Sequence, residues 1–195
     1  MRFIILSVLF LSVPVCAFSQ DVLRKTKVIR GEECSVDVFY KDGEEVGLQR
    51  RTADGQKDVE GKLPEGKVKF IDETTGVYGE EYYKRGEKHG TSRTYFPTGE
   101  LMKESYYLNG VLMTEKEFFK NGQVRFEADY SRNCDACKGG QEKGAGKIYY
   151  RNGKLKYEWN FNIEQVRGYQ RAYTQEGELR FEAYYDQEGR RLNNE

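Results

Sequence analysis

The sequence predicts an all-β fold, in which tandem β-hairpin repeats form an antiparallel meander and a single extended sheet. The first observation is a glycine that returns at a spacing of 23 or 24 residues over most of the chain. The second is a strict alternation of apolar and polar residues between the glycines, which is typical of strands with one buried face and one wet face. The third is a set of Asn-Gly and Asp-Gly pairs, which favour tight hairpin turns.

The repeat unit is defined by what surrounds each glycine. An aromatic residue stands four positions before it, an aliphatic residue two after it, an acidic residue five after it and a second aromatic eight after it. Each unit therefore predicts strand, turn, strand, turn, and each hairpin needs its neighbours to bury its rings. The glycines are Gly76, Gly99, Gly122, Gly153 and Gly177, at spacings of 23, 23, 31 and 24 residues, and the unit at Gly76 fits less well.

The strand after each glycine shows the alternation most clearly. Val124, Phe126, Ala128 and Tyr130 alternate with polar residues, and segments 155–161 and 179–185 repeat the pattern. We expect these apolar side chains to share one face of the sheet. Type I′ turns are expected at the Asn-Gly and Asp-Gly pairs, which tolerate positive φ. These pairs are residues 109–110, 121–122, 152–153, 42–43 and 54–55.

The N-terminal residues have the layout of a secretory signal peptide. Arg2 precedes an apolar run from Phe3 to Val15, and small residues stand before Gln20, so we expect residues 1–19 to be removed. The run is short for a membrane anchor, which needs ~20 residues. A lipoprotein cysteine at Cys16 is disfavoured, because Val15 occupies a position that needs a small residue. The expected location is extracytoplasmic: periplasm, outer surface or medium, with no transmembrane segment after cleavage.

The rest of the chain divides into two parts. Residues 20–65 fit the repeat poorly and are expected to form a leader or a capping hairpin. The repeat array is expected over residues 66–195, with an inserted loop at 133–145 that accounts for the one long spacing. The 32 basic and 32 acidic residues are evenly mixed, which is not the basic footprint of a nucleic-acid-binding protein.

The cysteines are the residues with the clearest capacity for chemistry. Signal cleavage leaves Cys34, Cys134 and Cys137, an odd number in a compartment that permits disulfides. Cys134 and Cys137 form a Cys-x-x-Cys motif, which serves redox chemistry or half of a zinc site in other settings. Because no helix follows it and no second ligand pair is near, a structural disulfide among the three is the preferred interpretation.

Other catalytic patterns are missing from the sequence. His89 is the only histidine and is expected in an exposed turn, so a His-Glu-x-x-His site is excluded. Residues 144–147 (Gly-Ala-Gly-Lys) lack the spacing of a phosphate-binding loop and precede a strand. We therefore expect a non-catalytic protein without cofactor or metal.

The repeated glutamates are also expected to be structural. Equivalent glutamates in adjacent hairpins lie two strands apart, about 10 Å, which is too far for the carboxyl pair of a retaining glycosidase. Each stands two residues from a cation, so we expect a solvated ladder of ion pairs within each strand. The pairs are Glu127 with Arg125, Glu158 with Lys156, and Glu182 with Arg180.

The unit at residues 90–110 resembles the bacterial MORN-repeat-variant family. The likeness lies in Tyr95-Phe96, the turn glycine Gly99, Leu101, Glu104 and the aromatic Tyr107 before Asn-Gly, and it extends over roughly residues 66–190, with a weaker echo at 39–43. The resemblance implies a hairpin-repeat fold. Some members are known as antitoxins of toxin–antitoxin systems, which implies protein binding. Eukaryotic MORN proteins are linked to membranes, but this chain lacks their regular Tyr-x-Gly-x-Trp spacing.

Two tyrosines point to a binding surface. Tyr106 and Tyr184 place a second aromatic on the face opposite the predicted core, where exposed tyrosines favour partner contacts. The first hypothesis is therefore a secreted or periplasmic protein-binding module, antitoxin-like or immunity-like. The alternatives are an envelope structural or glycan-binding protein, and a thiol oxidoreductase that uses Cys134 and Cys137. A homodimer would be one way to cover the apolar sheet face.

Overall fold

The computed structural model describes residues 21–28, 35–51, 57–130, 144–162, 167–186 and 190–192. These residues form strands and turns, and the strands join in one 16-stranded sheet, which confirms the all-β prediction. These described residues include no helix that is long and apolar enough to cross a membrane. Residues 1–19, Asp54-Gly55 and the cysteines Cys34, Cys134 and Cys137 lie outside the described residues.

Seven strands precede the well-defined repeats. They are β1 (Val22–Val28), β2 (Ser35–Lys41), β3 (Glu44–Arg51), β4 (Lys57–Gly61), β5 (Gly66–Ile71), β6 (Tyr78–Lys84) and the short β7 (Glu87–Lys88). The repeats then supply β8 (Gly90–Tyr95), β9 (Leu101–Leu108), β10 (Val111–Phe118), β11 (Val124–Asp129), β12 (Gly144–Tyr149), β13 (Leu155–Asn162), β14 (Arg167–Tyr173), β15 (Leu179–Tyr185) and β16 (Arg191–Leu192). β12 begins at Gly144, so the last two residues of the predicted insertion belong to a strand.

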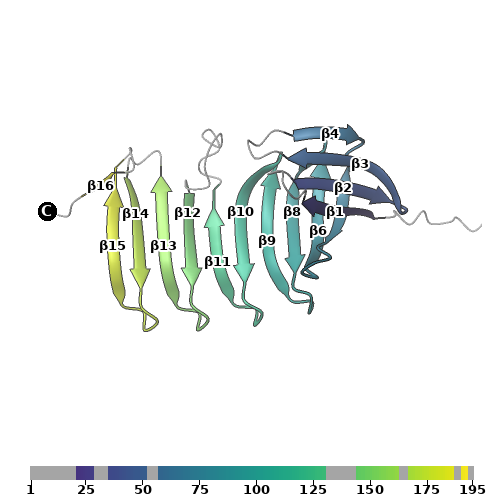
Figure 1. The fold of residues 1–195 in the computed structure, drawn as a ribbon. Helices are drawn as coiled ribbons and strands as arrows, with labels where there is room; N and C mark the ends of the chain where they lie inside the picture. The colour runs from purple at the N-terminus through teal and green to yellow at the C-terminus, as the bar shows by residue number, and fades with distance from the viewer. Residues whose placement is uncertain are drawn as a thin grey trace, which may run out of the picture.

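The sheet is a meander through the repeats but not at its N-terminal end. From β8 to β16 each strand pairs with the next along the chain, and all of these pairs are antiparallel. Beyond β6 and β5 the order becomes β1, β2, β3, β4, and β1 runs parallel to β5. Figure 1 shows that β1 to β4 run crosswise to β6 at this end of the molecule instead of extending the same flat sheet.

Four of the five repeat glycines occupy equivalent bends, as predicted, whereas the amide of Gly76 donates to the carbonyl of Asp72, four residues earlier. The amide N–H of each of these four donates to the carbonyl three residues earlier, at 2.9, 2.9, 3.0 and 3.1 Å for Gly99, Gly122, Gly153 and Gly177. All four have positive φ, between 82° and 101°. Their positions in the repeat are therefore set by the backbone conformation of the turn.

The turn type differs from the prediction at two of the Asn-Gly pairs. At 121–122 and 152–153 only the glycine has positive φ, so these are longer turns closed by glycine and the type I′ prediction is wrong there. Asn121 and Asn152 instead accept hydrogen bonds from the amides two residues on, at 3.2 and 3.0 Å. The pairs 42–43 and 109–110 have positive φ at both residues, as type I′ requires.

A β-bulge after each turn changes which side chains share a face. The register skips one residue, so that Phe118 pairs with Val124 while Glu117 pairs with Phe126. Successive residues point to opposite faces, which places Val124 and Phe126 on opposite sides of the sheet. The predicted common face for these two residues is therefore wrong. The same skip makes cross-strand partners of Tyr95 and Leu101, Tyr149 and Leu155, and Tyr173 and Leu179.

The N-terminal strands cover one face of β5 and β6. Phe39 of β2 and Val68 of β5 are fully buried, and Tyr83 of β6 is nearly so. The rings of Phe39 and Tyr83 meet edge to face, with centroids 5.6 Å apart. Val22, Val46 and Leu63 complete this core.

A buried ion network lies beside that core. The Arg24 guanidinium on β1 donates to Asp37 at 2.7 Å and to Glu81 at 3.3 Å. Glu81 on β6 also accepts from Lys88 at 2.5 Å and from the Tyr83 hydroxyl at 3.0 Å. Asp37 and Glu81 are only 4% and 3% exposed, so β1, β2 and β6 are joined by charges that water barely reaches.

Tyr83 gives this region a predicted sensitivity to alkali. Burial raises the pKa of the Tyr83 phenol, and the negative charge of Glu81 raises it further. The unfolded chain releases this proton near pH 10 and the folded chain keeps it, so stability falls as pH rises above about 10, by ~1.4 kcal/mol per pH unit. Urea denaturation between pH 9 and 11 should show a shallower decline for Tyr83→Phe; equal slopes in the two proteins would contradict this.

Candidate functional site

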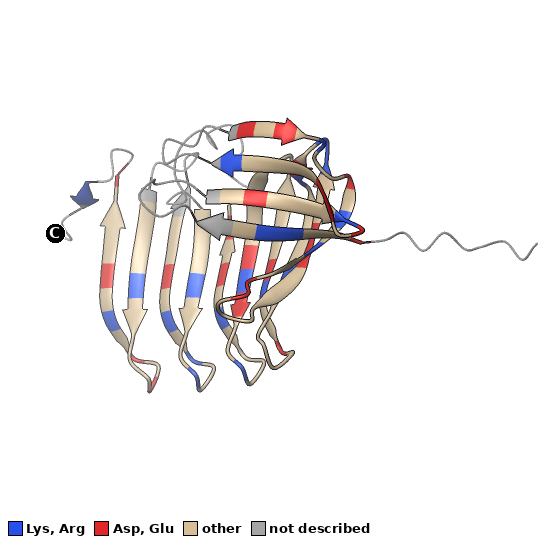
Figure 2. Cartoon of the chain, turned by 45° about the vertical axis from the view of Figure 1, so that its right-hand side comes forward, with Lys and Arg blue, Asp and Glu red and all other residues tan. Residues whose placement is uncertain are grey.

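The face opposite the N-terminal strands carries a row of charges that changes sign at every strand. Consecutive members are directly paired across neighbouring strands, so they share one face. We call these residues the charge row, and the sheet side that carries them the charged face; the alternating colours at mid-height in Figure 2 follow it. The charge row is Lys69, Glu80, Arg93, Glu104, Lys116, Glu127, Lys147, Glu158, Arg171 and Glu182.

Ion pairs in the charge row run between strands, not along them. Arg93 meets Glu104 at 2.8 Å, Lys116 meets Glu127 at 3.5 Å, and Arg171 bridges Glu158 and Glu182 at 3.6 and 2.5 Å. The predicted partners Arg125, Lys156 and Arg180 are therefore wrong. The bulge removes them from the face of their neighbouring glutamates, and Arg125 instead pairs with Glu117.

Tyrosine hydroxyls also donate hydrogen bonds to the last three glutamates of the charge row. Tyr149 donates to Glu127 at 2.6 Å, Tyr173 to Glu158 at 2.7 Å and Tyr184 to Glu182 at 2.9 Å. The hydrogen bond from Arg171 lowers the pKa of Glu182, and that from Tyr184 lowers it further. Burial, followed by the bond to its glutamate, raises the pKa of Tyr149. Arg171 and Tyr184 thus favour the ionised, hydrogen-bond-accepting form of Glu182, which is not the state of a general acid.

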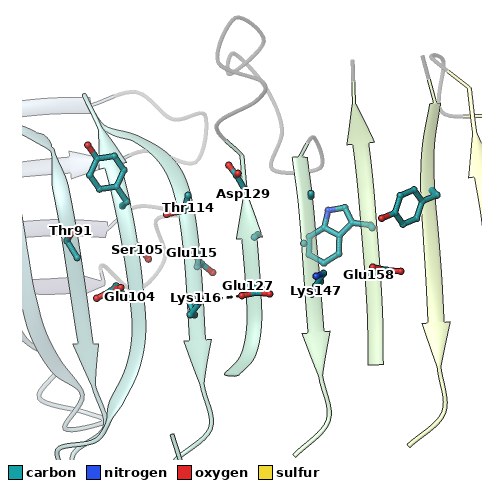
Figure 3. A pocket seen from close by; sticks show the side chains of 16 residues that line it. Thr91, Glu104, Ser105, Thr114, Glu115, Lys116, Glu127, Asp129, Lys147 and Glu158 are labelled. Carbon is teal, nitrogen blue, oxygen red and sulfur yellow. Dashed lines mark ion pairs between the residues drawn. The ribbon is translucent and has the colours of Figure 1, made fainter. Parts of the chain in front are cut away.

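A second row of side chains runs parallel to the charge row on the same face. Going from β8 to β15, its members are Thr91, Tyr106, Thr114, Asp129, Ala145, Asn160, Tyr169 and Tyr184. The side chains between Tyr106 and Tyr169 are short. A hollow of about 430 Å³ lies there, between the two rows, and Figure 3 shows the residues that line it.

Exposed apolar side chains gather at the N-terminal end of the same face. Tyr82, Tyr106, Leu108 and Val111 are 45, 42, 38 and 37% exposed. Tyr82 stands two residues after Glu80, Tyr106 two after Glu104, and Leu108 is the cross-strand partner of Val111, so all four lie on the charged face. Ile71 and Tyr78 are also exposed on this face, and the remaining exposed large apolar residues are Val59, Leu179 and Phe181.

The two tyrosines chosen from the sequence both lie on the charged face, in the second row. Tyr106 is exposed at one end of the hollow, whereas Tyr184 is half-buried beyond the other end and is hydrogen-bonded to Arg171 at 3.1 Å. Sequence reasoning missed Tyr82 and the charge row itself. A signal was present, because a cation stands six residues before four of the repeat glycines and a glutamate five residues after them.

Other sequence candidates contribute nothing to this site. His89 is half-buried between β7 and β8, not exposed as predicted, and its amide donates to the carbonyl of Tyr82 at 2.7 Å. In the described ranges, no three histidine, cysteine or acidic residues cluster as metal ligands would.

Comparison with known families finds a similarity in the central repeats. Three segments, residues 88–109, 111–132 and 142–162, match the MORN repeat variant. They span β8 to β13, the strands that carry the central part of the charge row. No curated protein matches the chain. These three segments are thus similar to MORN repeat variants, which agrees with the resemblance seen in the sequence.

Proposed function

We propose that this chain is a non-catalytic protein-binding module that recognises its partner with the charged face. MORN repeats in general are repeat modules that bind proteins or membranes. The observation that carries the proposal is the exposed apolar cluster of Tyr82, Tyr106, Leu108 and Val111, which lies beside the charge row. Tyrosine and arginine are, with tryptophan, the side chains most enriched among interface hot spots, and both occur on this face.

The balance of charge favours a protein over a membrane. The charge row has as many glutamates as lysines and arginines, and most of them are already in ion pairs. Binding to anionic lipids depends on an excess of basic residues near the surface, which this face lacks. A protein partner can instead use apolar contacts and place its own charges opposite the row.

The N-terminal residues support a location outside the cytoplasm. Their signal-peptide layout is the basis of that part of the proposal. An immunity-like or antitoxin-like role, in which the partner is a toxin, is a special case of the same function.

The test is alanine substitution once the partner has been isolated from the native host. We expect Tyr82→Ala and Tyr106→Ala each to weaken binding by about 30-fold, the loss of a hot-spot side chain worth ~2 kcal/mol. Phe181→Ala is the matched control, because Phe181 is 38% exposed but lies away from this cluster. Loss of binding in the control but not in the tyrosine variants, measured by calorimetry, would overturn the proposal.

A glycan partner is the second candidate. The hollow has tyrosines at both ends and Thr114 and Asp129 between them, which supplies ring faces and hydroxyl partners for sugars. A glycan array with the purified chain distinguishes the two. Strong binding to a defined glycan, lost in Tyr169→Ala, would favour this candidate over the protein partner.

A further inference from the structure

We infer that the hollow on the charged face receives an acidic side chain of the partner protein, and that Lys147 is the residue that binds it. This inference rests on the proposed function and specifies the chemistry of the partner. It begins from the shape of the hollow, which is set by residues at two positions of the repeat.

The hollow exists because two repeat positions vary while the rest of the unit recurs. Eight residues before the glycine stand Thr91, Thr114, Ala145 and Tyr169; seven after it stand Tyr106, Asp129, Asn160 and Tyr184. Short side chains therefore occupy the middle strands and tyrosines the flanking ones. Tyr106 on β9 and Tyr169 on β14 are five strand spacings apart, about 24 Å, which is room for a short extended peptide segment.

The acidic residues around the hollow are already engaged. Glu104 pairs with Arg93 at 2.8 Å, and Glu115, whose side chain is on the other face, pairs with Lys103 at 2.6 Å. Asp129 also has an interaction partner. A cationic side chain of a partner would have to compete with these existing contacts.

The two glutamates on either side of Lys147 are engaged as well. Glu127 accepts from Tyr149 at 2.6 Å and pairs with Lys116 at 3.5 Å. Glu158 accepts from Tyr173 at 2.7 Å and pairs with Arg171 at 3.6 Å. Each glutamate thus draws its positive partner from the strand on its far side, and neither is paired with Lys147.

Lys147 is the charged residue of the hollow that is available to a partner. Among the charged residues that line the hollow, and within the part of the chain that the structure describes, only Lys147 has neither an ion pair nor a side-chain hydrogen bond. Its side chain is exposed on β12, near the middle of the hollow (Figure 3). A carboxylate can bind this ammonium without breaking an existing pair, whereas a second cation would be repelled by it.

The experiment uses a displayed library of random peptides as the probe, selected against the full chain. The expected result is enrichment of peptides with an acidic residue flanked by apolar ones. Lys147→Glu should weaken these peptides at least tenfold, and a fresh selection against that variant should enrich lysine or arginine at the same position. Lys84→Glu, an exposed lysine on the same face but outside the hollow, is the control for general electrostatics and should leave the preference unchanged.

The outcomes separate the inference from the proposed function. Two results would overturn the role of Lys147: selected peptides that depend on Tyr106 but carry no acidic residue, or an acidic residue that is still selected against Lys147→Glu. Neither result would contradict protein binding by the charged face. If no selected peptide depends on Tyr106, or if only glycans or anionic phospholipid vesicles bind, the protein-binding function itself is overturned.

Discussion

Glu81→Gln is expected to lower the free energy of unfolding by about 3–5 kcal/mol, because it removes one partner from a buried ion network. Glu81 is 3% exposed and accepts from Arg24, Lys88 and the Tyr83 hydroxyl. The amide keeps the shape of the side chain but removes its negative charge and directs N–H groups at donors. The positive charges of Arg24 and Lys88 would then stay largely shielded from water without the negative charge of Glu81 to stabilise them. Urea denaturation followed by circular dichroism measures the loss.

The matched control is Glu104→Gln in the charge row. Glu104 is also a glutamate on a central strand with an ion pair, to Arg93 at 2.8 Å, but its side chain is 40% exposed. Exposed pairs contribute ~1 kcal/mol or less, so the control should change little. A loss of ~1 kcal/mol or less in Glu81→Gln, similar to that of the control, would show that the Glu81 network contributes little and that the N-terminal strands are held by their apolar core.

The sequence was sufficient to predict the repeat and its bends, because both follow from local backbone chemistry. A glycine with positive φ is required at each turn, so its recurrence fixes the hairpins independently of tertiary contacts. The alternation fixes strands for the same reason. The turn type at Asn121 and Asn152 was not predictable from the Asn-Gly pair alone, since the number of residues in the loop decides between turn classes.

The ion-pair partners on the charged face depend on the cross-strand register, which could not be predicted from the sequence. A bulge of one residue reverses the face of every side chain before it, as the opposite placement of Val124 and Phe126 shows. Pairing Glu127 with Arg125 was reasonable for an unbulged strand and fails in the structure. Only the cross-strand register reveals that Glu127 faces Lys116 and that Lys147 has no ion-pair partner in the described ranges.

The N-terminal strands were the least predictable part of the fold. Their order depends on the parallel contact of β1 with β5, and no local pattern in Val22–Val28 indicates such a distant neighbour. Nothing in the sequence distinguishes Arg24 and Glu81 from ordinary charged residues on a protein surface. They become buried only because β1 and β2 cross over β6, which brings residues 57 positions apart into hydrogen-bonding distance.

Gly146→Val is expected to displace the indole of Trp159 and to cost about 1–3 kcal/mol of stability, as overpacking of a well-filled site does. Gly146 and Trp159 are cross-strand partners, and a Cβ at Gly146 would overlap the six-membered ring of the indole. The indole also stacks on Phe126, with centroids 5.8 Å apart. Glycine in a strand interior is normally unfavourable, so its presence here is explained by the ring that covers it.

Trp159 is the single tryptophan, so its fluorescence reports this change directly. The emission of Gly146→Val should shift to longer wavelength as the ring moves into water, together with a lower urea midpoint. Ala145→Val is the control, since Ala145 is on the same strand but its side chain points to the charged face. Unchanged emission in Gly146→Val would mean that the strands separate to admit the valine while the ring stays packed. The stability of the sheet around Trp159 would then depend on strand spacing more than on the contact between Trp159 and Gly146.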